Sequence, residues 1–378
     1  MSSVKVLHCA DVHIGAAESF LGENATKRRF ETLITFEKII SEAKENQVDF
    51  LLLAGDVFHS NNVDSILIDR VFESFSSIPE INIIYAAGNH DPLNSFSPFL
   101  NRTLPDNLYV LGGEDECIEF PHKNTRIYGR SFTDSSMQGE SRFTLFPPKD
   151  DTVNIMVIHG ELKSDLNSNY NAITPDFVKF SGMDYIALGH VHKRSDILRL
   201  DSTYFAYSGC SEGQGFDELD DKGVYIGEIT KSGCNMQFKS ISMRRHLSLD
   251  IDLSDINDTA EIYGKILKQL KDNCGENYAA NLYKIVLTGE VSEEFNISTD
   301  ELQIRLNNEV YFAKVKDRTE IKIDTKALAK EVTLKGIFVR NMLKEINSAQ
   351  TEEEKILLKE ALQLGIKAFR SEVAYNED

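Results

Sequence analysis

The sequence is short of cysteines, long apolar runs and basic residues, and each shortage excludes a class of protein. The five cysteines are an odd number, are widely spaced and form no Cys-x-x-Cys pair, which argues against a disulfide framework and a zinc knuckle. No apolar run approaches the roughly 18 to 20 residues that span a bilayer. Residues 1–8 lead directly into an expected strand, without the pattern of a signal peptide. We therefore expect a cytoplasmic protein with no membrane segment.

The charge balance is strongly acidic. Lysine and arginine number 41 against 60 aspartates and glutamates, which gives a formal net charge of −19. This surplus disfavours nonspecific binding of polyanions, so a protein of this composition that acted on DNA would need metal ions or local basic patches. With 378 residues, the chain is long enough for two or three domains.

Short apolar runs alternate with amphipathic segments near the start of the chain. Expected strands at residues 5–9, 50–53 and 81–86 are separated by expected helices at residues 26–45 and 64–77. This alternation predicts a parallel sheet with right-handed crossovers. Two more buried strands are expected, and two further strands that close the sheet, at residues 153–158, 185–188, 204–207 and 224–229.

Polar side chains gather where these strands end. Six of the nine histidines lie there, with three aspartates and an asparagine: His13, His59, His90, His159, His190, His192, Asp11, Asp56, Asp91 and Asn89. Taken singly, each histidine is more simply explained as a structural residue. However, parallel strands point the same way, so their C-terminal ends meet at one rim of the sheet. The joint pattern predicts one polar cluster at that rim.

The composition of this cluster indicates the kind of metal that it would hold. Imidazoles, carboxylates and an amide are ligands that suit divalent ions such as manganese, iron or zinc. Because the set contains no thiolate, it does not resemble the structural zinc sites that are built from cysteines. The candidate ligands are more than one ion takes: Asp11, His13, Asp56, Asn89, His159, His190 and His192. We therefore expect two divalent ions that share a bridging carboxylate and lie about 3.5–4 Å apart.

The motifs, in their order along the chain, resemble a known superfamily. The motifs of this chain are Asp11-x-His13, Gly55-Asp56, Gly88-Asn89-His90-Asp91, His159 and Gly189-His190-x-His192. Together they resemble the motifs of the calcineurin-like metallophosphoesterases. Their details resemble the SbcD branch of DNA double-strand-break repair nucleases, and the YhaO-like exonucleases in particular. One departure is Val63, which stands where that branch often carries proline.

The resemblance implies an α/β fold, a four-layer α/β/β/α metallophosphoesterase sandwich with a small α+β capping domain and a helical C-terminal tail. On this basis we assign residues 1–242 to the nuclease domain, 243–328 to the capping domain and 329–378 to the tail. In the tail, Thr351 and Glu354 match a capping box. The apolar stripes of the tail either pack on their own domain or lie in the groove of a partner, such as an ATPase.

The resemblance also implies a role for each motif residue. One ion would be held by Asp11, His13, Asp56 and His192, and the second would share Asp56 and add Asn89, His159 and His190. Manganese is the expected metal. His90 would face the site without binding an ion, where it would position the phosphate or stabilise the leaving oxygen, and Asp91 would orient it. For His59, a contact with the phosphate and a structural turn both remain open.

Basic residues near the motifs are candidate contacts with DNA phosphates. Lys193 and Arg194 are the best placed because they directly follow the last motif, and Arg130 is a third candidate. Weaker candidates are residues 27–29, Arg126 and residues 244–245. For each of these side chains, the alternative interpretation is a surface charge that contacts only solvent. No basic tract is interleaved with aromatics, so we expect contacts that are independent of the DNA sequence.

We expect a manganese-dependent DNA exonuclease on duplex ends and single-strand endonuclease, which works in DNA repair with an SbcC-like coiled-coil ATPase. The resemblance also implies a homodimer through the nuclease domain, for which the helix at residues 64–77 and a loop with Phe96, Phe99 and Leu100 are the candidate contacts. Two other classes remain open. The same site would serve a phosphoprotein phosphatase or cyclic-nucleotide phosphodiesterase, and a non-catalytic DNA-tethering scaffold would use the ions structurally.

Overall fold

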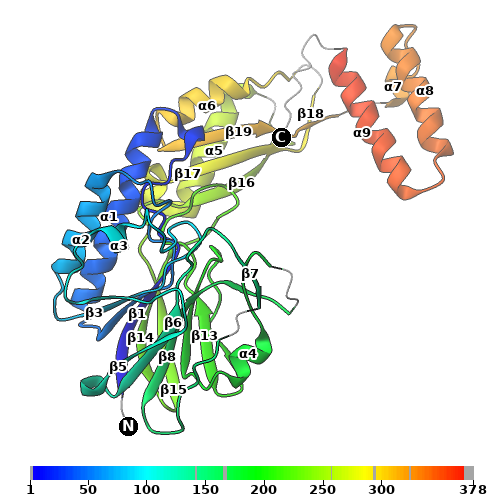
Figure 1. Cartoon of the computed structure of the whole chain (residues 1–378). Coiled ribbons are helices and arrows are strands. Elements are labelled where there is room, and N and C mark those ends of the chain that lie inside the picture. The colour runs from blue at the N-terminus through cyan, green and yellow to red at the C-terminus, as the bar shows by residue number, and fades with distance from the viewer. Residues whose placement is uncertain are drawn as a thin grey trace. The chain divides into compact units, whose positions relative to one another are not determined.

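The computed structural model describes residues 3–140, 143–164, 168–256, 258–292, 295–322 and 325–369. The chain forms two units, residues 1–246 and residues 247–378, and many of their elements are labelled in Figure 1. No helix among the described residues is long and apolar enough to cross a membrane.

A six-stranded mixed sheet is built around the first strand of the chain. Its strands are β1 (Ser3–Cys9), β2 (Phe50–Leu53), β3 (Asn82–Tyr85), β4 (Leu108–Val110), β14 (Gly223–Thr230) and β15 (Gly233–Ser240). The order is β15-β14-β1-β2-β3-β4. Strands β1 to β4 run parallel, whereas β14 pairs antiparallel with β1 and with β15. Every residue of β2 is buried, as expected for a strand that is covered on both faces.

A second six-stranded sheet carries the later motifs. Its strands are β5 (Glu116–Phe120), β6 (Thr125–Arg130), β8 (Val153–His159), β11 (Tyr185–Gly189), β12 (Leu198–Leu200) and β13 (Thr203–Tyr207). The order is β12-β13-β11-β8-β6-β5, and the four inner strands are parallel. The parallel strands of both sheets therefore each present a C-terminal edge, which is where open α/β sheets bind ligands.

The two sheets pack face to face, and helices cover their outer faces. Val6, Phe50 and Leu52 of the first sheet share one apolar cluster with Ile155 and Tyr185 of the second. Helices α1 (Asn24–Glu45) and α2 (Ser65–Ser76) cover the first sheet. The second is covered by α4 (Pro175–Phe180) and a small sheet of β7 (Met137–Glu140), β9 (Glu161–Leu162) and β10 (Tyr170–Ile173). This arrangement confirms the predicted four-layer sandwich, with α1 and α4 on opposite sides in Figure 1.

Two predictions about the strands are corrected. The strands at residues 203–207 and 223–230 do not close one sheet, because β13 lies in the second sheet and β14 in the first. Residues 208–222 carry the chain from one sheet to the other. Strand β15 and the short elements β7, β9, β10, β12 and α4 were not predicted, since most of them span too few residues to show a period.

The short helix α3 (Pro98–Asn101) corrects one predicted dimer contact. Phe99 is only 2% exposed, and its ring stacks on that of Tyr85 with a centroid separation of 4.1 Å. Phe99 therefore belongs to the core of its own chain, and the prediction that it contacts a second copy is wrong. Its neighbours Phe96 and Leu100 are 77% and 58% exposed. The remaining short helices of this unit are η1 (Ser19–Leu21) and η2 (Pro121–Lys123).

The second unit begins with an α+β layer. A three-stranded sheet of β16 (His246–Asp252), β17 (Leu282–Thr288) and β19 (Phe312–Asp317) packs with α5 (Thr259–Cys274) and α6 (Thr299–Asn307) around one apolar cluster. Side-chain N-caps start both helices, because Asp258 accepts from Ala260 N and Ser298 from Glu301 N. Shorter elements are η3 (Gly275–Ala280) and the paired strands β18 (Glu290–Val291) and β20 (Glu320–Ile321).

The described chain ends in a pair of helices. After α7 (Thr325–Leu328), α8 (Leu334–Ser348) and α9 (Glu352–Ala368) pack through Val339, Ile346, Leu362 and Ile366. Thr351 Oγ1 accepts from Glu354 N at 3.1 Å and is the N-cap, as predicted. The Glu354 carboxylate, however, accepts from Gln350 N instead of the N-cap amide. The predicted division into a cap at 243–328 and a tail at 329–378 stays a prediction.

Candidate metal centre

The seven predicted ligands meet at the C-terminal edges of the two facing sheets. Asp11 and His13 follow β1, Asp56 follows β2, Asn89 follows β3, and three histidines end or follow β8 and β11. Asp56 lies between two groups of these side chains. Its Oδ2 is 3.8 Å from His13 Nε2 and 3.4 Å from His159 Nε2. The carboxylate that the sequence pattern nominates as the bridge therefore faces ligands from both sheets.

The first group consists of Asp11, His13 and His192. One ligand atom from each lies within 4.8 Å of the others. His13 Nε2 and His192 Nε2 are 3.0 Å apart, so both rings turn this nitrogen toward the same point. With Asp56 beside them, these are the four residues expected around the first ion.

The second group forms around Asn89. Its Oδ1 is 3.1 Å from His159 Nε2 and 3.2 Å from His190 Nδ1. Asp56 and His159 also form a cluster with Asp11 whose ligand atoms lie within 4.8 Å of one another. The described residues thus assemble two adjoining sets of nitrogen and oxygen donors, and neither set contains a thiolate, as divalent ions of the manganese, iron and zinc class prefer.

The backbone at these positions adopts an uncommon conformation. Of the nine non-glycine residues with positive φ in the described chain, four are predicted ligands: Asp11 (51°), His13 (51°), Asp56 (54°) and His190 (99°). A left-handed residue other than glycine costs roughly 1–2 kcal/mol. Such strain clusters at functional sites, where the surrounding structure imposes it. At each of these four residues the positive φ turns the backbone sharply after its strand, so that the ligand side chain reaches the edge where the two sheets meet.

Two glycines of the motifs make room for the cluster. A Cβ on Gly55 would lie 2.3 Å from His159 Nδ1, and a Cβ on Gly88 would lie 2.1 Å from Asp56 Oδ1. Any larger residue would displace a predicted ligand. Close packing of the ligand side chains therefore explains why a glycine directly precedes Asp56 and Asn89.

Burial shifts the protonation of the predicted ligands. Burial raises the pKa of Asp11 and the pKa of Asp56 above the usual range of a carboxyl group. Burial also lowers the pKa of His159 and the pKa of His190 to about 4. The apolar surroundings thus disfavour uncompensated charge on either kind of side chain. A divalent cation placed among them would stabilise the ionised carboxylates and coordinate the neutral imidazoles, so the donor set fits a metal site.

His90 lies at the exposed rim of this cluster. Its ring centroid is 4.7 Å from that of His13 and 5.3 Å from that of His59. His90 Nδ1 is 3.0 Å from the His59 carbonyl oxygen. His90 is exposed, and one ring nitrogen each of His13, His59 and His90 lies within 4.8 Å of the others, so the His90 ring borders the first donor group. The His59 side chain is close to the same edge, and its Nδ1 is buried with no partner among the described residues.

The predicted pairing of His90 with the Asp91 carboxylate is wrong. Asp91 is fully buried and accepts backbone N–H groups of Asp56 (3.1 Å), Phe58 (3.0 Å) and Gly88 (2.9 Å). These three amides belong to turns that would otherwise leave them unsatisfied. Asp91 therefore joins the turn after β2 to the turn after β3, and the carbonyl of His59 takes its place as the partner of His90.

The candidate DNA contacts differ in their surroundings. Lys193 and Arg194 are exposed beside the last motif, and the Arg194 guanidinium lies 4.2 Å from the Phe238 ring centroid. The Arg130 side chain is 15% exposed and donates to Asn171 Oδ1 at 2.9 Å. Arg28 is wrong as a phosphate contact, because its side chain is 1% exposed and bonds three carboxylates of the protein.

Two residues near the centre were missed by the sequence patterns. Glu218 accepts a hydrogen bond from His192 Nδ1, and the ring of Tyr170 lies against that of His190 with a centroid separation of 4.7 Å. Glu218 follows a glycine-rich segment that reads only as a turn, and Tyr170 lies in an unpredicted strand of four residues. Neither position carries a spacing signal that could have identified it.

Comparison with known proteins places this geometry in a family. Calcineurin-like phosphoesterases match residues 4–194. The uncharacterized metallophosphoesterase YhaO of Bacillus subtilis is 27% identical over 252 residues, which cover 63% of this chain and 60% of YhaO. The DNA double-strand break repair protein Mre11 of Methanopyrus kandleri is 25% identical over 65% of this chain and 59% of its own length.

The chain therefore spans about three fifths of the length of these two relatives. A longer match is to Mre11 of Sulfurisphaera tokodaii, which is 23% identical over 94% of this chain and 92% of that protein. The matched region of the family contains every motif from Asp11 to His192. This chain belongs to the calcineurin-like phosphoesterase family.

Proposed function

We propose that this protein is a metal-dependent DNA nuclease, an exonuclease on duplex ends with single-strand endonuclease activity. The observation that carries the proposal is the pair of donor groups on either side of Asp56, with His90 at their exposed rim. Membership of the phosphoesterase family supports hydrolysis of a phosphoester. The relatives described as DNA double-strand break repair proteins support DNA as the substrate.

In this proposal two divalent ions, manganese in the first place, occupy the two donor groups. When bound, they would neutralise charge on the phosphate and activate the attacking water. Asp11, His13 and His192 would hold one ion, Asn89, His159 and His190 the other, and Asp56 would contact both. The positive φ of four of these residues would keep the donors aimed at the ions in the absence of substrate.

The role proposed for His90 follows from its hydrogen bond. Because Nδ1 is held by the His59 carbonyl oxygen, the ring is fixed and Nε2 is the nitrogen left for a substrate. A phosphate bound at the rim would therefore meet Nε2, which in the protonated ring donates to the phosphate or to the leaving oxygen. Lys193 and Arg194 would contact neighbouring phosphates of the DNA backbone, without reading bases.

The helix pair α8–α9 is the proposed docking segment for an SbcC-like coiled-coil ATPase. Its inner face holds the pair together, whereas several large apolar side chains point outward. The exposed set is Leu334, Ile337, Ile356, Leu357 and Leu364, and each member is 46% exposed or more. An apolar face of this kind on two helices suits the side of a partner helix.

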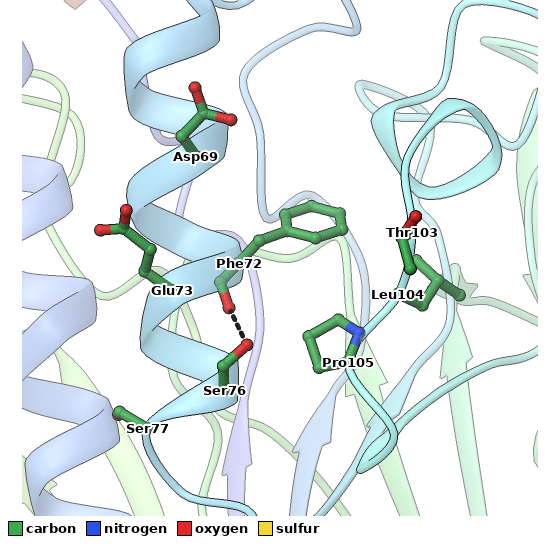
Figure 2. Close-up of a pocket in the computed structure, with 8 residues that line it drawn as sticks. All are labelled: Asp69, Phe72, Glu73, Ser76, Ser77, Thr103, Leu104 and Pro105. Carbon is green, nitrogen blue, oxygen red and sulfur yellow. Dashed lines mark hydrogen bonds between the residues drawn. The ribbon is translucent and has the colours of Figure 1, made fainter.

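A homodimer through the surface beside α2 is also proposed. Ile66, Phe96 and Leu100 expose apolar side chains there. Further along α2 the surface changes, as Figure 2 shows: Asp69 and Glu73 line a pocket across which the Phe72 ring points toward residues 103–105. Asp69 is paired there with Arg102, and burial of these charged groups in a dimer contact would cost desolvation energy, so we place the contact at the apolar Ile66 end of the helix.

The test is digestion of labelled linear duplex DNA by the purified chain with Mn²⁺, in parallel with the variant His90→Ala. We expect degradation by the parent, and loss of degradation in the variant at unchanged metal content, because the proposal places His90 outside the two donor groups. Cleavage of bis-p-nitrophenyl phosphate without cleavage of DNA would instead indicate a phosphatase or small-substrate phosphodiesterase. Inactivity on both substrates, with the ATPase partner present, would indicate a scaffold.

A further inference from the structure

A carboxylate stands directly behind one of the proposed ligands. Glu218 Oε1 accepts a hydrogen bond from His192 Nδ1. On the other side of the same ring, Nε2 lies 3.0 Å from His13 Nε2, at the first donor group. Glu218 therefore contacts the ring nitrogen that faces away from the proposed ion. A carboxylate in this place fixes the tautomer and orientation of a ligating histidine and raises its basicity.

Glu218 is itself held by its own loop. Its Oε2 accepts from Gln214 N at 2.8 Å and from Cys210 Sγ at 3.6 Å. Its backbone N–H donates to Gly215 O at 3.1 Å. Since both carboxylate oxygens are occupied by donors of the protein, the carboxylate cannot swing away from His192 without losing several bonds.

The loop that carries Glu218 is anchored in turn to α1. Glu212 Oε2 accepts from Arg28 Nη2 at 2.8 Å, and Glu212 Oε1 accepts from Thr35 Oγ1 at 2.6 Å and Met243 N at 2.5 Å. All of these atoms are buried or nearly so. The support of His192 therefore extends from Glu218 through its loop to a buried ion pair, which is the kind of rigid second layer that keeps a ligand in place.

The other proposed histidine ligands have different support. His159 Nδ1 is 2.8 Å from the Ala54 carbonyl oxygen, and His13 Nδ1 has no hydrogen-bond partner in the described part of the chain. His190 turns Nδ1 to Asn89, on the side of the donors. His13 and His159 face the Asp56 carboxylate on the side of the donors, whereas in the regions that the structure describes His192 has a carboxylate on the ring nitrogen that faces away from them. The two donor groups are thus chemically unequal.

We propose that Glu218 is a positioning residue for His192 and that it sets the affinity of the first donor group for its metal ion. This inference rests on the two-ion centre proposed above and adds a residue that none of the motifs contains. His192, Cys210 and Glu218 also lie close enough to hold an ion by themselves. Because both Glu218 oxygens already accept protein hydrogen bonds, we assign the carboxylate to the support of His192 and not to a third ion.

The experiment is a titration of the metal-free full chain with Mn²⁺. Binding is measured by calorimetry and by the electron paramagnetic resonance signal of free Mn²⁺. The parent is expected to bind two ions. In Glu218→Gln and Glu218→Ala, one ion should bind between about 10-fold and 100-fold more weakly while the other is unchanged. His192→Ala should weaken the same ion, which identifies the affected position.

The matched control is Asp217→Asn, which removes one negative charge from the exposed neighbour of Glu218 and should leave both affinities unchanged. Thermal unfolding without metal checks that each variant is folded. Equal affinities in the parent and both Glu218 variants would overturn the inference but leave the proposed function standing, as would equal weakening of both ions. A parent that binds no Mn²⁺ would overturn the two-ion centre itself.

Discussion

At the scale of single residues, the centre combines ionisable groups whose protonation is set by burial and by each other. Burial opposes a charge on His192, but the hydrogen bond and charge of Glu218 and the charge of Asp11 outweigh it and raise the pKa of His192 to about 9. Burial also raises the pKa of Asp11. In the metal-free protein at neutral pH, a proton therefore occupies positions where a metal ion would bind.

The first prediction is that Mn²⁺ binds more tightly as the pH rises from about 6.5 to 8.5. The ion must displace the proton held by His192 and Asp11, whose charges depend on each other, so the affinity should rise by up to about tenfold per pH unit. Calorimetry in buffers of different ionisation enthalpy measures both the affinity and the protons released. An affinity independent of pH, with no proton release, would contradict the proposed ligand role of His192.

The raised pKa of His192 has the opposite effect on the metal-free fold. Its folded value of about 9 exceeds the ordinary value of 6.5, so its stabilising contribution is complete below pH 6.5 and is lost as the pH rises toward 9. Metal-free protein should therefore unfold more easily across this range, and Mn²⁺ should remove the trend.

Asp91 provides the second prediction. Asp91→Ala would leave buried N–H groups of Asp56, Phe58 and Gly88 without their acceptor, and each unsatisfied group costs about 1–3 kcal/mol. We expect the free energy of unfolding to fall by about 3 kcal/mol or more, and Mn²⁺ affinity to fall with it. Denaturant titration measures the first effect. Unchanged stability would instead mean that these three amides do not depend on Asp91 for an acceptor.

At this scale the sequence predicted which residues gather, but not how each is supported. Asp11, Asp56 and His159 follow apolar runs, and parallel strands bring such ends together. The partners of Asp91, by contrast, are backbone amides of another turn about 35 positions away, and Glu218 lies 26 positions after His192. No local period relates such pairs, so only the folded chain reveals them.

At the scale of elements, periodicity predicted the long helices and the buried strands well. It could not decide which sheet a strand joins, because β13 and β14 are both strand-like runs in the sequence but lie in different sheets. It also could not decide which apolar residues of a helix reach the core. Phe30 and Ile34 of α1 are 48% and 47% exposed, whereas Phe36 and Ile39 are fully buried, since packing partners select the buried face.

The third prediction concerns the helix pair α8–α9. Leu357 is 66% exposed, so Leu357→Glu should change the free energy of unfolding by no more than about 0.5 kcal/mol. The same variant should lose binding to a co-purified coiled-coil ATPase, because a charge would be buried in an apolar contact. The control is Lys359→Glu, which places the same side chain about 200° around the helix.

Co-sedimentation or surface plasmon resonance with the ATPase measures this effect. Equal loss of binding in both variants would point to general charge repulsion. Undiminished binding of Leu357→Glu would mean that the partner docks on another surface.

At the scale of the whole molecule, the formal charge of −19 opposes contact with DNA. Several of its arginines are also committed to ion pairs within the protein, among them Arg28, Arg126 and Arg244. The two divalent ions of the proposed centre would offset part of this charge where the phosphate binds. Recognition of DNA should therefore depend on metal more than on basic surface.

The fourth prediction follows. At about 0.1 M salt, the His90→Ala variant should bind duplex DNA with Mn²⁺ present and show no binding after chelation. The slope of log affinity against log salt should be shallow, near −2, because the proposal assigns phosphate contacts to two side chains, Lys193 and Arg194. Fluorescence anisotropy with labelled duplex measures both quantities. Tight binding after chelation, with a steep slope, would reveal a basic surface that we have not identified.

The left-handed backbone at Asp11, His13, Asp56 and His190 has a consequence for how the protein responds to mutation and selection. Each of these residues is held in a conformation that costs roughly 1–2 kcal/mol, and Asp11 adds the cost of a buried carboxylate. Asp11→Asn keeps an acceptor for the His190 amide but removes that charge, so metal-free Asp11→Asn should melt at a higher temperature than the parent, most clearly near pH 8.

A library of variants selected only for thermal stability should therefore accumulate substitutions at these same four positions. The selected variants should be more stable than the parent but should no longer bind metal. Catalytic competence and durability are in opposition at this edge of the sheets.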